Sequence, residues 1–126
     1  MRAALPTPTE IAELADILTV ELTTIGRRSG RPARIEIWWF YIEKRFVITG
    51  TPRPRDWFAN IGSHPGVIIH ANGADYAAVG RVINDEVFRR RVLTDPVTSW
   101  YRSRADLAEM IGCSPMVEID FSSGLS

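Results

Sequence analysis

Residues 20–49 read VELTTIGRRSGRPARIEIWWFYIEKRFVIT, and the alternation of apolar and polar side chains within them predicts three β-strands. The first strand covers residues 20–24 and runs into the turn 26–32, where two glycines and a proline end it. Residues 34–41 carry bulky β-branched and aromatic side chains on both faces, which predicts a central strand of the sheet. A tight turn then leads to its partner strand at 45–49.

Clear local signals flank this stretch on both sides. Thr7-Pro8-Thr9-Glu10 has the pattern of a capping box with proline at the first helical position, and it predicts a helix over 8–18. Asn72-Gly73 separates two apolar runs at 67–71 and 76–83. Because both residues tolerate positive φ, the pair predicts a tight hairpin.

The remaining segments read as helices and one last strand. A short helix is expected over 56–61, and a helical segment broken at Asp95-Pro96 follows the hairpin. Residues 116–121 alternate cleanly and predict a final strand. About six strands with short connections and outer helices predict an α+β fold, a small antiparallel barrel. The expected single domain, residues 1–126, comprises the helix at 8–18, a barrel core at 19–83 and 115–121, and the helical segment at 85–111.

Composition narrows the class of protein further. The chain has 126 residues, of which 45% are hydrophobic and 24% are charged, the usual balance of a globular domain. No apolar run approaches the roughly 20 residues that cross a bilayer, and the first residues lack the apolar core of a secretory signal. We therefore expect a cytoplasmic protein with no transmembrane segment. One cysteine and two histidines supply too few ligands for a metal site, and none is expected.

The charges are unevenly placed although the formal net charge is zero. Residues 26–55 hold eight basic and two acidic side chains. Arg27, Arg28 and Arg31 share one turn with Ser29 and Gly30, so guanidinium and backbone N–H groups would face the same volume. The spacing does not match a Walker A loop. The turn thus suggests a site for a small phosphate or carboxylate ligand, with a solvated surface turn as the plainer interpretation and nucleic-acid binding as a third.

Aromatic side chains accompany this basic region. Trp38, Trp57 and Phe58 offer flat faces that suit a planar ring, although aromatic residues of a sheet more often pack in the core. Asn60 follows on the same short helix, where either its amide bonds a ring or a backbone group or the residue ends the helix. No acid, base or nucleophile pattern stands out, so the catalytic residues stay unknown. A bound cofactor that performs the chemistry would explain this absence.

Three motifs together carry a family resemblance. They are Leu22–Pro32, reading LTTIGRRSGRP, the strand end Ile37-Trp38-Trp39, and the helix Asp56–Ile61, reading DWFANI. The chain resembles the deazaflavin-dependent nitroreductase and quinone reductase family, whose members are split β-barrels of the flavin-reductase type. The resemblance implies the 8-hydroxy-5-deazaflavin coenzyme F-420 as cofactor. It also implies hydride transfer from the reduced cofactor to a quinone, nitroaromatic or activated alkene.

The resemblance also suggests roles for individual residues. The turn would hold the cofactor phosphate, the loop after the strand 45–49 and the tryptophan helix would flank the ring, and Trp38 would contact the substrate. The loop is compact here, whereas many members carry a longer serine- and glycine-rich one. The expected cofactor-binding residues are Arg27, Arg28, Ser29, Gly30, Arg31, Gly50, Thr51, Pro52, Arg53, Trp57, Phe58 and Asn60.

Other functions remain open at this point. A reductase of the same fold could use FMN, which presents the same phosphate to the same turn. A catalytically idle cofactor carrier would bind deazaflavin without turnover. A barrel for single-stranded nucleic acid would use exposed aromatics and arginines, but the neutral net charge argues against a nucleic-acid partner. We expect a small-molecule electron acceptor and a homodimer.

Overall fold

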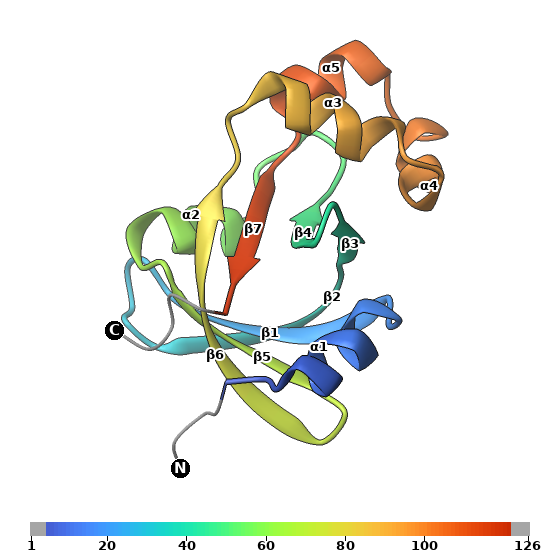
Figure 1. Ribbon diagram of the computed structural model, residues 1–126. Helices are drawn as coiled ribbons and strands as arrows, with labels where there is room; N and C mark the ends of the chain where they lie inside the picture. The colour runs from blue at the N-terminus through green and yellow to red at the C-terminus, as the bar shows by residue number, and fades with distance from the viewer. Residues whose placement is uncertain (1–4, 122–126) are drawn as a thin grey trace.

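The computed structural model describes residues 5–121 (Figure 1). Among these residues one antiparallel sheet is flanked by short helices (Figure 1). The strands are β1 (Thr19–Ile25), β2 (Pro32–Trp38), β3 (Phe40–Ile42), β4 (Arg45–Thr49), β5 (Gly66–Ala71), β6 (Ala74–Val82) and β7 (Met116–Asp120). The α-helices are α1 (Pro8–Ala15), α2 (Asp56–Ser63), α3 (Glu86–Thr94), α4 (Ser99–Arg102) and α5 (Leu107–Cys113), with a 3-10 turn at Pro96–Thr98.

The sheet is curled because its two edge strands are neighbours in the chain. The strand order is β2-β1-β5-β6-β7-β4-β3, and only Trp39 separates β2 from β3. The chain therefore passes directly from one edge of the sheet to the other, which bends the sheet around an apolar interior (Figure 1). This arrangement confirms the expected α+β fold built on an antiparallel split barrel.

The prediction of one continuous central strand over 34–41 is wrong. Trp39 interrupts it, because its backbone N–H donates to the carbonyl of Leu18 at 2.9 Å and its ring Nε1 donates to that of Ile17 at 3.0 Å. These bonds fix Trp39 against the α1–β1 connection instead of a neighbouring strand. The first half of the predicted strand thus becomes an edge strand, in which Ile35 is 38% exposed.

The hairpin prediction is confirmed. Asn72 and Gly73 connect β5 to β6 with φ values of 53° and 76°. Both values lie in the left-handed region, which asparagine and glycine adopt at low cost. The register then pairs His70 with Asp75 directly across the two strands.

The capping box at the first helix is also confirmed, but the helix is shorter than predicted. Thr7 and Glu10 exchange side-chain and backbone hydrogen bonds at 2.9 and 3.2 Å. The helix ends at Ala15, and Asp16 is its C-cap. Residues 16–18 instead form the connection that receives Trp39. None of the helices within residues 5–121 has the length and hydropathy of a membrane span.

Apolar residues form one cluster inside the barrel and a second beneath the helices α3 to α5. The first includes Leu22, Ile48 and Ile69, and the second includes Val47 and Met110, all of them fully buried. The predicted helical segment 85–111 splits into short pieces because Asp85, Asp95 and Asp106 each accept a backbone N–H at a new helical start.

Arg89 joins α3 to the end of α5. It is 8% exposed, and its guanidinium donates to the carbonyls of Ile83, Ile111 and Ser114 at 2.9, 2.7 and 2.6 Å. A positive charge at the last carbonyls of a helix is favourable, because those carbonyls carry the negative end of the helix dipole. Arg89 is therefore a structural residue that fixes the helical layer over the barrel.

Candidate functional site

The basic turn between β1 and β2 has a defined shape. The N–H of Gly26 donates to the carbonyl of Arg31 at 2.8 Å, and the N–H of Gly30 donates to that of Gly26 at 2.9 Å. A Cβ at Gly26 would lie 2.5 Å from Oγ of Ser29, and Gly30 has a φ of +69°. Both positions thus favour glycine, which the sequence provides.

Asn60 ties this turn to α2. Its side-chain oxygen accepts hydrogen bonds from the backbone N–H and from Nη1 of Arg27, at 3.1 and 3.0 Å. Its amide nitrogen donates to Oγ1 of Thr24 at 3.1 Å. Asn60 is only 4% exposed, so it acts as a buried bridge and not as the end of a helix. Arg27 also reaches Asp56 at 3.3 Å.

Two arginines of the turn keep their charges unpaired. Arg28 and Arg31 are exposed, and neither forms an ion pair with a carboxylate among residues 5–121. Ser29 accepts the N–H of Arg31 at 3.1 Å and holds the turn in shape. Two guanidinium groups are thus free to bind an anion, while Arg27 is fixed to the protein.

A cavity of about 420 Å³ lies between β2, the loop after β4, α2 and α4. We call it the aromatic pocket. Trp38 lines it and contacts Trp100 and Tyr101 edge to face, with ring centroids 5.6 and 6.3 Å apart. Its lining residues are Glu36, Ile37, Trp38, Thr49, Gly50, Thr51, Arg53, Arg55, Trp57, Trp100 and Tyr101.

Arg55 lies in the wall of this pocket without an acidic partner. Its Nη2 donates to the carbonyl and to Oγ1 of Thr51, both at 3.1 Å, and its buried Nε has no hydrogen-bond partner. No carboxylate among residues 5–121 forms an ion pair with it. Burial, together with the nearby charge of Arg53, lowers the pKa of Arg55. An arginine nevertheless stays protonated at neutral pH.

Like Thr49, Tyr101 is a buried, hydroxyl-bearing side chain of the pocket. It is 7% exposed, and burial raises the pKa of its phenol to about 12, against a smaller opposite effect of Arg55. The phenol is therefore neutral at physiological pH and does not compensate the charge of Arg55.

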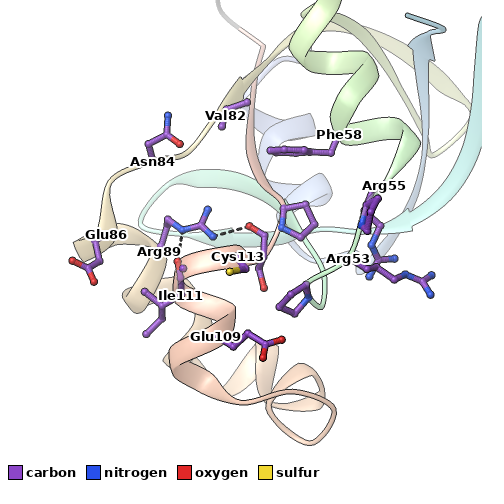
Figure 2. A pocket seen from close by; sticks show the side chains of 15 residues that line it. Arg53, Arg55, Phe58, Val82, Asn84, Glu86, Arg89, Glu109, Ile111 and Cys113 are labelled. Carbon is purple, nitrogen blue, oxygen red and sulfur yellow. Dashed lines mark hydrogen bonds between the residues drawn. The ribbon is translucent and has the colours of Figure 1, made fainter.

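The loop after β4 separates the aromatic pocket from a second cavity of about 850 Å³. Figure 2 shows this second cavity, with Phe58 and Val82 above Cys113 and with Arg53 and Arg55 on the loop side. Phe58 and Pro52 line this second cavity and not the aromatic pocket.

The structure thus divides the predicted site residues into three groups. Trp38, Gly50, Thr51, Arg53 and Trp57 meet in the aromatic pocket. Pro52 and Phe58 support the loop from the far side, where Arg53 also lines the second cavity. The turn residues Arg27, Arg28, Ser29, Gly30 and Arg31 line neither cavity, and Asn60 joins their turn to α2.

Several residues of the pocket were not among the predicted site residues, among them Trp100, Tyr101 and Arg55. Trp100 and Tyr101 come from a four-residue helix far along the chain, and no local pattern placed it against β2. Arg55 ends the loop Gly50–Arg55 that was expected to flank the ring, but it was not itself among the expected cofactor-binding residues.

Comparison with known proteins identifies the family. The model of the F420H(2)-dependent quinone reductase family matches residues 7–110, which include the turn, the Trp38 strand, the loop and α2. The chain belongs to this family. It is therefore an enzyme that depends on reduced F420, and the resemblance noted in the sequence is confirmed. Among curated proteins no sequence matches the chain.

Solved structures share the fold at low sequence identity. An F420-H2 dependent reductase has 16% identity and a TM-score of 0.60, with 81% of this chain and 93% of that chain covered. A conserved hypothetical protein from Mycobacterium tuberculosis has 20% identity and a TM-score of 0.65, with 94% and 83% covered. A structure described as a domain-swapped dimer has 17% identity and a TM-score of 0.61, with 83% and 81% covered.

The residues of the pocket fit a planar, negatively charged cofactor. Trp38, Trp57 and Trp100 supply flat apolar surface, which favours stacking with a ring system. The buried Nε of Arg55 has no partner within the described residues, and Arg28 and Arg31 form no ion pair there on the turn that Arg27 and Asn60 join to α2. Such unsatisfied donors point to a ligand that accepts hydrogen bonds.

Proposed function

We propose that the protein transfers a hydride from reduced coenzyme F-420 to a quinone, a nitroaromatic or an activated alkene. The observation that carries this proposal is the aromatic pocket, where the loop after β4, Trp57 and Trp38 meet beside unpaired arginines. The family membership supports the cofactor. The aromatic lining of the pocket supports a planar acceptor that lies beside the cofactor.

Each group of residues has a proposed role. Arg28 and Arg31 bind the cofactor phosphate, while Ser29, Gly30 and the bridge from Arg27 to Asn60 give their turn its shape. These exposed guanidinium groups provide bidentate donors, which suit phosphate oxygens.

The loop and its neighbours hold the ring. Gly50, Thr51 and Arg53 form one wall and Trp57 another, while Trp38 contacts the acceptor. Pro52 and Phe58 keep the loop in position from behind. When bound, the reduced deazaflavin supplies the hydride. The protein orients the two reactants and excludes water from the space between them.

A proton must follow the hydride to the reduced acceptor. Solvent or a nearby hydroxyl supplies it, and Tyr101 is a hydroxyl of the pocket that holds its proton at neutral pH, because burial raises the pKa of the phenol to about 12. A reductase of this kind can therefore work without a catalytic triad.

Binding measurements distinguish this function from its rivals. The purified protein is titrated with oxidised F-420 and, in parallel, with FMN, and quenching of cofactor fluorescence is followed. Saturable binding of F-420 that the double variant Arg28→Ala/Arg31→Ala loses supports the proposal. Binding of FMN alone would move the protein to the flavin-dependent reductases. Binding of F-420 without transfer to any acceptor would make it a cofactor carrier.

We also propose that two copies of the chain associate. Large apolar side chains are exposed, among them Ile35 on the edge strand β2 at 38% and Trp100 beside the pocket at 46%. One structure of similar fold is described as a domain-swapped dimer. Light scattering coupled to size-exclusion chromatography tests this with a mass near twice 14.2 kDa expected. The cytoplasmic location and the single domain over 1–126 stay predictions.

A further inference from the structure

Arg55 brings an uncompensated positive charge into the aromatic pocket. Two of its hydrogen bonds go from Nη2 to Thr51, and its buried Nε has none. By contrast Arg89, which is 8% exposed, donates to four backbone carbonyls. Arg55 therefore differs from Arg89, because its Nε and Nη1 form no hydrogen bond within residues 5–121 although the side chain lines a cavity.

The surroundings do not neutralise this charge. Tyr101 is uncharged because burial raises the pKa of its phenol to about 12. Among residues 5–121, Glu36 is the one carboxylate that lines the pocket; it is exposed, and no ion pair joins it to Arg55. Arg53 adds a second positive charge, which together with burial lowers the pKa of Arg55. The aromatic pocket thus has a positive wall.

The backbone holds the guanidinium in place. Arg55 lies against Gly50, where a Cβ would come within 3.1 Å of Nη2. Thr51 fixes the same nitrogen through its carbonyl and its hydroxyl, and two prolines at 52 and 54 restrict the loop between them. The charge is therefore presented by a preorganised loop and not by a free side chain, which favours binding of an anion at a defined place.

We propose that Arg55 forms an anion site of the aromatic pocket and that its ligand is an aromatic oxyanion, a planar ring that carries an ionised oxygen. The half-buried Trp38 and the more deeply buried Trp57 line the space for the ring, and the guanidinium binds the oxygen. Two sources offer this chemistry if the proposed function holds. One is the 8-hydroxyl of the oxidised deazaflavin ring in its ionised form, and the other is the oxygen of a quinone as it becomes a quinolate.

The first arm of the test measures the cofactor. Oxidised F-420 is bound to the protein, and the ionisation of its 8-hydroxyl is followed by absorption across a pH series. An opposite charge nearby favours the ionised form, so the bound 8-hydroxyl should titrate about one pH unit lower in the wild type than in Arg55→Met. Arg55→Lys keeps the charge and should retain most of this difference.

The second arm uses 4-nitrophenol and no cofactor, because its phenolate is coloured and its ionisation can be read directly. The wild type should bind the phenolate about tenfold more tightly than Arg55→Met does, whereas binding of the neutral phenol should be similar for both. Arg90→Met, which removes an exposed arginine of α3, serves as the charge-matched control and should behave as the wild type in both arms. Circular dichroism and a thermal melt establish that each variant is folded.

The arms separate the possible outcomes. A shift only in the F-420 arm assigns the site to the cofactor ring, and a shift only in the 4-nitrophenol arm assigns it to the acceptor. If F-420 does not bind but the wild type binds 4-nitrophenolate more tightly than Arg55→Met does, the anion site is supported and the proposed function is contradicted. The proposal would be overturned if a folded Arg55→Met variant matched the wild type in both arms, that is, in the pH at which the bound 8-hydroxyl ionises and in the affinity for 4-nitrophenolate.

Discussion

The side-chain oxygen of Asn60 accepts two hydrogen bonds from Arg27, one from the backbone N–H at 3.1 Å and one from Nη1 at 3.0 Å. This relationship joins the basic turn to α2, the helix that also supplies Trp57 to the aromatic pocket. The proposed phosphate site and the proposed ring site therefore share one rigid connection, and a change in the connection should affect both.

Substitution of Asn60 tests this connection. Asn60→Ala leaves the N–H of Arg27 and the hydroxyl of Thr24 without their buried partner, so we expect a loss of about 1–3 kcal/mol in the free energy of unfolding. Binding of F-420 should weaken as well, because the turn loses its anchor. Urea denaturation and a fluorescence titration measure the two effects. Asn84→Ala, at an exposed asparagine, is the matched control and should change neither.

Removal of the two free arginines should affect binding without affecting stability. Arg28 and Arg31 are exposed and unpaired within the described residues, so Arg28→Ala and Arg31→Ala should each leave the melting temperature nearly unchanged. Each should weaken F-420 binding about tenfold or more, the typical loss of a charge-assisted hydrogen bond. Titration at several salt concentrations measures this, and Arg90→Ala provides the comparison. Unaltered affinity in both variants would place the phosphate elsewhere.

The strand break at Trp39 can be tested through its ring nitrogen. Trp39→Phe keeps an aromatic ring next to Phe46, whose centroid lies 4.3 Å away, but it removes the donor to the carbonyl of Ile17. We expect a cost of about 1–3 kcal/mol in chemical denaturation. Trp100→Phe, at a side chain 46% exposed, should cost less than about 0.5 kcal/mol. Equal losses in the two variants would argue against the role of Trp39.

A pH effect is expected from the contact between Glu10 and Tyr76. The backbone N–H of Thr7 and the hydroxyl of Tyr76 bind the carboxylate, and these bonds lower the pKa of Glu10 below 4.5. A lowered pKa in the folded state means that the stabilisation is present above pH 4.5 and is lost as the pH falls through the folded value. Tyr76→Phe removes one of these bonds. When the pH is lowered from about 6 to about 3, the melting temperature of this variant should therefore fall less than that of the wild type.

Local chemistry made much of the fold predictable. Asn72-Gly73 favours a tight hairpin, since both residues accept positive φ. The capping box at Thr7 and Glu10 needs only four consecutive residues. The glycines of the basic turn are equally local. These signals are confirmed because no distant residue competes with them.

Long-range contacts decided what the sequence could not predict. The continuous strand over 34–41 fails because the partners of Trp39 lie about twenty residues earlier, at Ile17 and Leu18. The aromatic pocket is similar. Trp38, the loop residues and Trp57 follow from motifs, but Tyr101 reaches Trp38 only because the helical layer packs on the barrel.

The most direct test of the proposed function is the fate of the hydride. Reduced F-420 that carries deuterium at the transferred position is mixed under anaerobic conditions with the protein and an activated alkene such as 2-cyclohexenone. Quinone and nitroaromatic acceptors are tested in parallel by the return of the oxidised cofactor absorption. The proposal predicts that the product carries a carbon–deuterium bond and that turnover is slower than with the unlabelled cofactor. Saturated binding of reduced F-420 with no oxidation by any of the three acceptor classes would contradict it.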